Sequence, residues 1–136
     1  AGDGVAGGFG HQRGLGAIHA IAHPFGGLYD AHHGLLNGII MPYVVKANRR
    51  KIEKDIERAA AYLGLKGGFN GFLKWIVALR KEIGIPHALK DIGIDTKRLD
   101  EVAAMAVKDP SAGGNPIQFT EKQYKALAKK CVTGDL

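Results

Sequence analysis

Histidine is the residue in this chain whose type and spacing best fit chemistry. Five of the six histidines lie in residues 1–45, and neutral imidazole is the commonest nitrogen ligand of zinc and iron. His19 and His23 are four residues apart, so on a helix they share one face about 6 Å apart, where a metal could bridge them. A catalytic zinc or iron needs three or four ligands, commonly including a carboxylate, and Asp30 is the candidate nearby in sequence.

The spacing alone leaves two readings of these histidines open. A histidine on an apolar helix face is often a hydrogen-bonded core residue, whereas a dense group with one acid and no base nearby favours metal binding. The metalloprotease pattern H-E-x-x-H is excluded because position 20 is Ala20, which cannot act as the general base. Metal binding and a structural role therefore remain as alternatives at this point.

The elements around the histidines differ sharply in charge. Residues 1–45 contain a single basic residue, Arg13, and eleven of the twenty glycines, while the remaining Lys and Arg follow in residues 46–136. This predicts a buried or site-forming segment followed by a solvated scaffold, within one domain of 136 residues and net charge +6. The single cysteine, Cys131, excludes an internal disulfide and fits a reducing compartment, so we expect a cytoplasmic protein without a membrane-spanning segment.

Two amphipathic helices are predicted in the charged part of the chain. Apolar residues recur every three to four positions over 49–63 and again over 69–83. Gly64 and Gly84 follow these stripes and provide the stop signals.

A third helix is expected over 99–106. Asp95 or Thr96 is a suitable N-cap for it, and the Asp109-Pro110 pair should end it.

The remaining helices are predicted from a capping pattern and from an apolar run. Thr120-x-x-Gln123 is a capping-box pattern that precedes a final helix. Residues 34–48 are apolar on nearly every side, which indicates a core helix, with Pro42 marking a kink or a first turn. Since no segment shows period-two alternation between hairpin turns, the predicted fold class is all-α, a helical bundle.

The histidine segment resembles a known family. Residues 14–27 read GLGAIHAIAHPFGG and are followed by His33-Gly34, which is similar to the signature of the iron-containing (group III) alcohol dehydrogenases. Met41-Pro42, the helix around Ile56, and Lys108-Asp109 with Asn115-Pro116 also resemble the carboxyl-terminal half of that family. The similarity therefore runs along essentially the whole chain.

The resemblance implies a role for each histidine of the motif. His19 and His33 correspond to two metal ligands, and His23 corresponds to a histidine beside the metal and near the nicotinamide that relays a proton. Pro24 would support this division, because a proline disfavours helical geometry at the preceding residue and can turn the His23 ring aside. His32 stands where many relatives have proline, so its role stays open.

The resemblance also implies what lies outside this chain. Residues 1–136 correspond to the C-terminal metal-binding helical domain of a dehydroquinate synthase-like two-domain enzyme. The N-terminal nucleotide-binding domain, with its glycine-rich pyrophosphate loop and an Asp and a His that complete the metal shell, would be separate, and residues 2–7 do not match such a loop. Asp30 matches no family ligand, and we expect it to accept a hydrogen bond from a neighbouring ring N–H.

The implied activity is the interconversion of an alcohol with an aldehyde or ketone using NAD or NADP. By the same resemblance, the metal, Fe²⁺ or in some relatives Zn²⁺, would act as a Lewis acid on the substrate oxygen, and the intact enzyme is expected to be a homodimer or higher oligomer. The substrate is a small alcohol or carbonyl compound, with no nucleic acid or membrane as partner, and the fragment alone is expected to be inactive.

Two rival functions follow from the residues themselves. The first is a stand-alone helical metal- or haem-binding module that uses His19, His23 and His33 and has no dehydrogenase activity. The second is a basic nucleic-acid binder built on the cations of residues 46–58, but acidic residues interrupt that run, which favours a solvated helix face.

Overall fold

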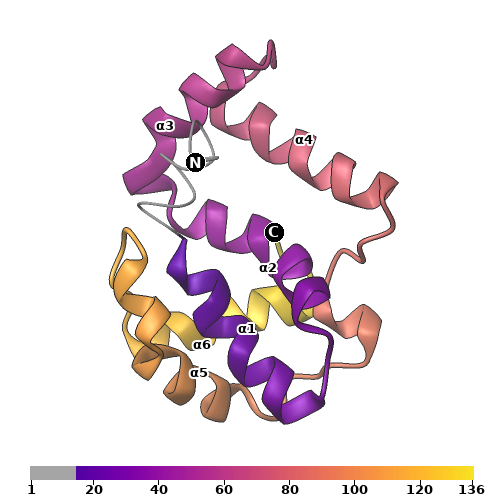
Figure 1. The fold of residues 1–136 in the computed structure, drawn as a ribbon, viewed down its shortest axis with the longest axis vertical. Helices are drawn as coiled ribbons and strands as arrows, with labels where there is room; N and C mark the ends of the chain where they lie inside the picture. The colour runs from indigo at the N-terminus through magenta and orange to yellow at the C-terminus, as the bar shows by residue number, and fades with distance from the viewer. Residues whose placement is uncertain (1–14) are drawn as a thin grey trace.

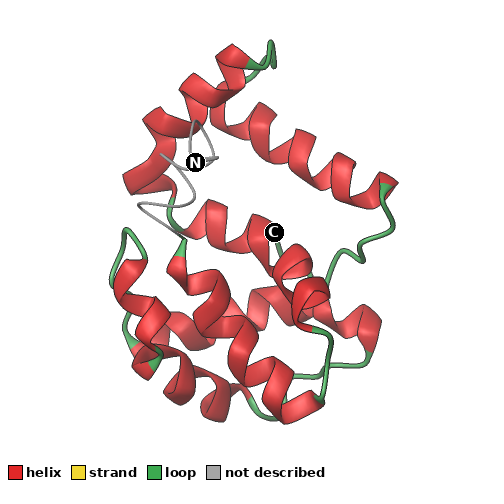
Figure 2. Ribbon diagram, in the orientation of Figure 1, coloured by secondary structure: helices red, strands yellow, loops and turns green. Residues whose placement is uncertain are grey.

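Six α-helices and two short 3-10 helices form the part of the chain that the structure describes, residues 15–136 of a computed structural model. No strand occurs within these residues, so the all-α prediction is confirmed (Figures 1 and 2). The elements in chain order are α1 (Gly16–Tyr29), α2 (His33–Ala47), α3 (Arg49–Tyr62), α4 (Gly68–Glu82), η2 (Leu89–Ile92), α5 (Leu99–Lys108), η3 (Pro110–Gly114) and α6 (Glu121–Thr133).

Local signals set most of the helix ends where the sequence predicts them. Gly64 and Gly84 adopt positive φ angles of 74° and 87° after α3 and α4, a conformation that glycine reaches without a Cβ clash. At α6 the capping box forms, with Gln123 N donating to Thr120 Oγ1 at 3.2 Å and Thr120 N donating to Gln123 Oε1 at 2.8 Å.

The predicted cap of the third helix is wrong. α5 begins at Leu99 after Arg98, whose side chain makes no cap hydrogen bond. Asp95 instead accepts a hydrogen bond from Lys97 N at 3.0 Å, closing a short turn before the helix. The Asp95 carboxylate therefore caps this turn and not α5.

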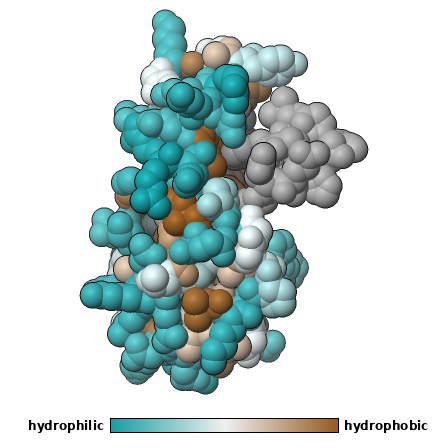
Figure 3. Space-filling view, turned by 90° about the vertical axis from the view of Figure 1, so that its left-hand side faces the viewer, coloured by the Kyte–Doolittle hydropathy of each residue, from teal (hydrophilic) through white to brown (hydrophobic). Residues whose placement is uncertain are grey.

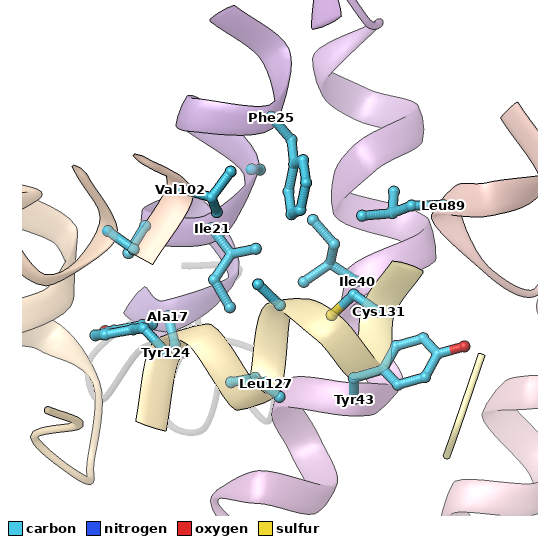
Figure 4. Close-up of a cluster of buried hydrophobic side chains, with 14 of the residues drawn as sticks. Ala17, Ile21, Phe25, Ile40, Tyr43, Leu89, Val102, Tyr124, Leu127 and Cys131 are labelled. Atoms are coloured by element: carbon cyan, nitrogen blue, oxygen red, sulfur yellow. The ribbon is translucent and has the colours of Figure 1, made fainter. Parts of the chain in front are cut away.

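The main core lies where α1, α2, α5 and α6 meet. Its side chains come from all four helices and from η2 and point toward one another, as Figure 4 shows for ten labelled residues, of which Leu89 belongs to η2. α2 is buried along much of its length, as the apolar run predicts. The largest fully buried side chains of this core include Tyr43, Tyr124, Phe25, Ile21, Leu36 and Ile40.

Pro42 lies inside α2 and does not interrupt it. Proline has no N–H, so the carbonyl of Gly38 one turn earlier lacks its helical donor. Arg80 of α4, only 4% exposed, donates to the carbonyl of Ile39 at 3.0 Å and approaches that of Gly38 at 3.5 Å. A buried guanidinium thus compensates for the missing backbone hydrogen bond and ties α4 to α2.

Helices α3 and α4 form a hairpin that packs against α2 and has its own small core (Figure 1). Large apolar side chains at the C-terminal half of α4 and just after it are exposed, among them Trp75, Leu79 and Ile83. On the face shown in Figure 3, apolar atoms reach the surface in the middle of an otherwise largely hydrophilic exterior. Within residues 15–136, no helix combines the length and the apolar character that crossing a membrane requires.

Candidate metal centre

Three histidines converge on one exposed point of the molecule. The ring centroids are 5.3 Å apart for His19 and His33, 5.4 Å for His23 and His33, and 5.6 Å for His19 and His23. One ring nitrogen of each residue lies within 4.8 Å of the other two. Ligands bonded to a zinc at about 2.1 Å are about 3.4 Å apart, so small side-chain rotations would bring the three nitrogens to one ion.

The donor set fits a divalent transition metal. Imidazole nitrogen suits iron and zinc, and three such donors at one point form the protein part of known catalytic sites. The expected approach of His19 to His33 is therefore present in the structure. His19 and His23 also lie side by side, as their four-residue spacing predicts. His19 is therefore close to both of the other histidines.

α1 carries His19 and His23 on one face, one helical turn apart. The helix runs without a break from Gly16 to Tyr29 with Pro24 inside it. The expectation that Pro24 would turn the His23 ring aside is wrong, because His23 keeps its helical position and its ring stays beside the other two. The preference of pre-proline residues for extended backbone is small compared with the packing of α1 against α2 and α5.

His33 reaches the site because α2 begins there. Asp30 ends α1 in the left-handed conformation, with φ 53°, and the chain reverses within the next two residues. His32 then serves as the N-cap of α2, its Nδ1 accepting a hydrogen bond from Leu35 N at 3.2 Å. The open role of His32 is thus a helix cap, which sets His33 as the first helical residue.

Asp109 is the carboxylate of this site, and Asp30 is not. Asp109 Oδ2 lies 2.8 Å from His23 Nδ1, while the Asp30 side chain forms no hydrogen bond within residues 15–136. Burial opposes ionisation of Asp109, but the hydrogen bonds from His23 and from Ser111 outweigh it and hold the pKa of that carboxyl below its usual value. Asp30 is close to the histidines in sequence, but the fold brings Asp109 to the His23 ring. The expectation that Asp30 accepts a hydrogen bond from a ring N–H is therefore wrong.

A buried pair of asparagine side chains anchors the loop that carries Asp109. Asn115 Nδ2 donates to Asn48 Oδ1 at 2.8 Å and to Ile117 O at 2.7 Å, and Asn48 Nδ2 donates back to Asn115 Oδ1 at 3.2 Å. Asn115 Oδ1 also accepts from Ala17 N at 3.3 Å, which supplies a cap that α1 lacks locally. The pair joins the start of α1, the junction of α2 with α3, and η3.

Gly16 permits the close approach of α1 to η3. A Cβ at this position would lie 1.8 Å from the backbone oxygen of Ser111, so no other residue fits without a shift of the backbone. Asp109 Oδ1 accepts from Ser111 N at 2.8 Å, which holds the carboxylate in the same loop. The backbone contact at Gly16 and the hydrogen bond to Ser111 N together hold Asp109 beside the α1 face that carries His23.

A groove of about 910 Å³ opens beside the histidines, between α2 and α4. His19 lies at its edge, and its walls are largely apolar, with Met41, Phe72 and Trp75 among them. The amide oxygen of Asn37, on the same groove, is buried and has no hydrogen-bond partner among residues 15–136.

The structural roles of Asp109, Asn48 and Asn115 do not follow from the sequence patterns. The Asp109-Pro110 pair predicts only a helix end, and Asn48 and Asn115 enter no predicted structural contact. The Asp-Pro and Asn-Pro pairs at 109–110 and 115–116 were the available signal, since both mark a tight, shaped loop. Neither pair indicates where that loop docks.

Comparison with known proteins gives consistent matches along the chain. Residues 2–132 match the model of the Fe-containing alcohol dehydrogenase family, C-terminal. The chain is 34% identical over 119 residues to alcohol dehydrogenase 4 of Saccharomyces cerevisiae, covering 85% of this chain and 31% of the relative. It is 33% identical over 114 residues to lactaldehyde reductase of Escherichia coli, covering 79% of this chain and 30% of the relative.

The fold matches solved structures of the same kind. A crystal structure of 1,3-propanediol oxidoreductase superposes with a TM-score of 0.79 at 30% identity, covering 85% of this chain and 32% of that one. An alcohol dehydrogenase from Oenococcus oeni gives a TM-score of 0.76 at 29% identity, covering 84% and 32%. The chain therefore spans about a third of the length of the relatives that it matches.

Proposed function

Since this chain belongs to the iron-containing alcohol dehydrogenase family, we propose that it is the C-terminal helical domain, residues 1–136, of an oxidoreductase that interconverts an alcohol with an aldehyde or ketone using NAD or NADP. The observation that carries this proposal is the convergence of three imidazoles within a chain whose residues 2–132 match that family. The named activities of the relatives, on alcohols, lactaldehyde and 1,3-propanediol, support a small alcohol or carbonyl substrate.

We propose His19 and His33 as the metal ligands of this domain. Both present ring nitrogens to one point on the exposed face, and imidazole donors fit Fe²⁺ or Zn²⁺. A bound divalent ion supplies a Lewis acid that polarises the substrate oxygen. The remaining ligands and the nucleotide would come from an N-terminal nucleotide-binding domain.

We assign proton transfer and contact with the nicotinamide to His23. Its side chain is half exposed, and its Nδ1 is engaged by Asp109. The other nitrogen, Nε2, is therefore the atom that accepts the hydroxyl proton of the alcohol and passes it to solvent. The division between two ligands and one relay follows the family motif, and the metal analysis described in the Discussion tests it.

The rival functions are less well supported. A stand-alone metal- or haem-binding module leaves the match over residues 2–132 unexplained. A nucleic-acid surface on α3 is opposed by its ion pairs, because Arg49 contacts Glu53 and Arg58 contacts Asp55. A cytoplasmic location and a homodimeric or larger assembly complete the proposal.

The test uses the protein at its full natural length. Purified enzyme loaded with Fe²⁺ or Zn²⁺ should reduce NAD or NADP when a panel of short alcohols and diols is added. Chelation should abolish turnover and metal should restore it. Absence of turnover with every alcohol and both nucleotides, in metal-loaded and folded protein, would refute the proposed activity.

A further inference from the structure

The two oxygens of the Asp109 carboxylate have different partners. Oδ1 accepts a hydrogen bond from Ser111 N at 2.8 Å, and Oδ2 lies 2.8 Å from His23 Nδ1. An ionised carboxylate has no proton to donate, so the hydrogen between Asp109 and His23 belongs to the ring. In the neutral ring this leaves the lone pair on Nε2.

Asp109 is held far more firmly than the ring that it contacts. Its side chain is 12% exposed, whereas that of His23 is 50% exposed. The loop that carries Asp109 is pressed against Gly16 and tied to the buried Asn48–Asn115 pair. The carboxylate is therefore the fixed partner, and it sets both the rotation and the tautomer of the imidazole.

We infer that Asp109 is the positioning residue of His23, holding the ring with hydrogen on Nδ1 and the lone pair of Nε2 available for the proton of the substrate hydroxyl. This inference rests on the proposed function for its catalytic consequence. The tautomer itself follows from the Asp109 contacts alone. The ring centroids of His19 and His33 lie 5.6 and 5.4 Å from that of His23, and neither ring forms a hydrogen bond with His23.

Asp109→Asn is a sharp test because the loop predicts which way the new amide points. The Ser111 N–H needs an acceptor, so the amide oxygen takes the place of Oδ1 and the NH₂ group faces His23 Nδ1. A donor facing Nδ1 requires that nitrogen to accept, which moves the ring hydrogen to Nε2. The variant should keep the loop and reverse the tautomer.

Asp95→Asn provides a matched control. Asp95 also accepts a hydrogen bond from the backbone N–H two residues later, Lys97 N at 3.0 Å, and its second contact is the hydroxyl of Tyr29. Asp95 caps a loop in the same way, but it forms no hydrogen bond with His19, His23 or His33.

The first measurement is the tautomer in metal-free, full-length protein labelled with ¹⁵N-histidine. Long-range proton–nitrogen correlation spectra distinguish the two tautomers, and His23→Gln identifies the His23 signals by their loss. We expect hydrogen on Nδ1 in the wild type and in Asp95→Asn, and on Nε2 in Asp109→Asn. Hydrogen on Nε2 in the wild type overturns the inference, even if Asp109→Asn does not fold. An unchanged tautomer in folded Asp109→Asn overturns it as well.

The second measurement separates positioning from structural support in the metal-loaded enzyme. Asp109→Asn should lower kcat on the order of 10²–10⁴-fold, with KM and bound metal little changed, while Asp95→Asn should keep the wild-type kcat. A reversed tautomer with unchanged kcat would overturn the catalytic part of the inference. If the wild type turns over no alcohol, the proposed function fails, and the spectra still decide whether Asp109 sets the tautomer.

Discussion

Asn115→Ala should destabilise this domain strongly, although the residue lies outside the hydrophobic cores. Asn115 is 3% exposed, and its partner Asn48 is fully buried. Truncation to alanine removes the amide that links the start of α1 to η3. Three groups lose their hydrogen bond to this amide: the N–H of Ala17, the carbonyl of Ile117 and the Oδ1 of Asn48. Asn48 Nδ2 loses one acceptor as well, but it keeps its hydrogen bond to Val44 O.

The size of the effect follows from counting stranded groups. A buried polar group left without a hydrogen bond costs about 1–3 kcal/mol, so three such groups imply roughly 3–9 kcal/mol. Water that enters the vacated space recovers part of this, which favours the lower end, about 3–5 kcal/mol. Such a loss is a large fraction of the roughly 5–15 kcal/mol by which domains are stable.

A double-mutant cycle with Asn48→Ala checks the mechanism. In the double variant neither amide is left facing a missing partner, so its cost should be smaller than the sum of the two single costs by about 1–3 kcal/mol. Asn70→Ala is the matched control, because Asn70 is an exposed asparagine whose change should alter stability by about 0.5 kcal/mol or less.

Urea unfolding of the 136-residue chain measures these differences. Circular dichroism reports on all helices, and the fluorescence of Trp75, the one tryptophan, reports on the α3–α4 hairpin. The reasoning is refuted if Asn115→Ala costs less than about 1 kcal/mol, or if the two single costs simply add. Either result would mean that the amide pair does not act as a unit.

Three further predictions concern the histidines, a buried hydroxyl and the chain by itself. In the full-length enzyme, His19→Ala and His33→Ala should lose bound metal. His23→Ala should retain the metal and turn over on the order of 10²–10⁴-fold more slowly. Metal analysis that finds equal metal loss in His23→Ala would contradict the relay role. Burial raises the pKa of Tyr124 to about 12, and its hydroxyl has no hydrogen-bond partner within the described residues 15–136. Tyr124→Phe should therefore leave the free energy of unfolding unchanged or raise it by about 1 kcal/mol, and a loss above that size in urea unfolding would reveal a partner. The 136-residue chain alone should bind metal weakly and reduce no NAD or NADP with any alcohol, and nucleotide reduction by the pure chain would overturn the need for a second domain.

The helices of this domain could be predicted from the sequence because their signals are local. Apolar residues at three- to four-residue spacing face one side of any helix that forms, and glycine stops act within one turn of their own position. The capping box of Thr120 and Gln123 is local in the same sense. For the same reason, the closeness of His19 and His23 follows from a separation of four residues alone.

Two expectations from local sequence rules are wrong because another interaction outweighs the local preference. Pro24 disfavours a helical His23, yet α1 continues through both residues, because the packing of a whole helix outweighs one backbone preference. Asp95 was a suitable cap for α5 but satisfied a nearer N–H. Sequence rules name the candidates in such cases, and the free energy of packing selects among them.

The site itself was decided by tertiary structure. His33 meets the other two histidines because the turn at 30–32 folds α2 back along α1, and Asp109 reaches His23 across 86 residues through the docking of η3. Hydrogen-bond partners depend on distances in space of a few ångströms, which sequence separation does not encode. That is why Asp30, seven residues from His23, was the natural choice from the sequence, while the fold brought Asp109 to the ring.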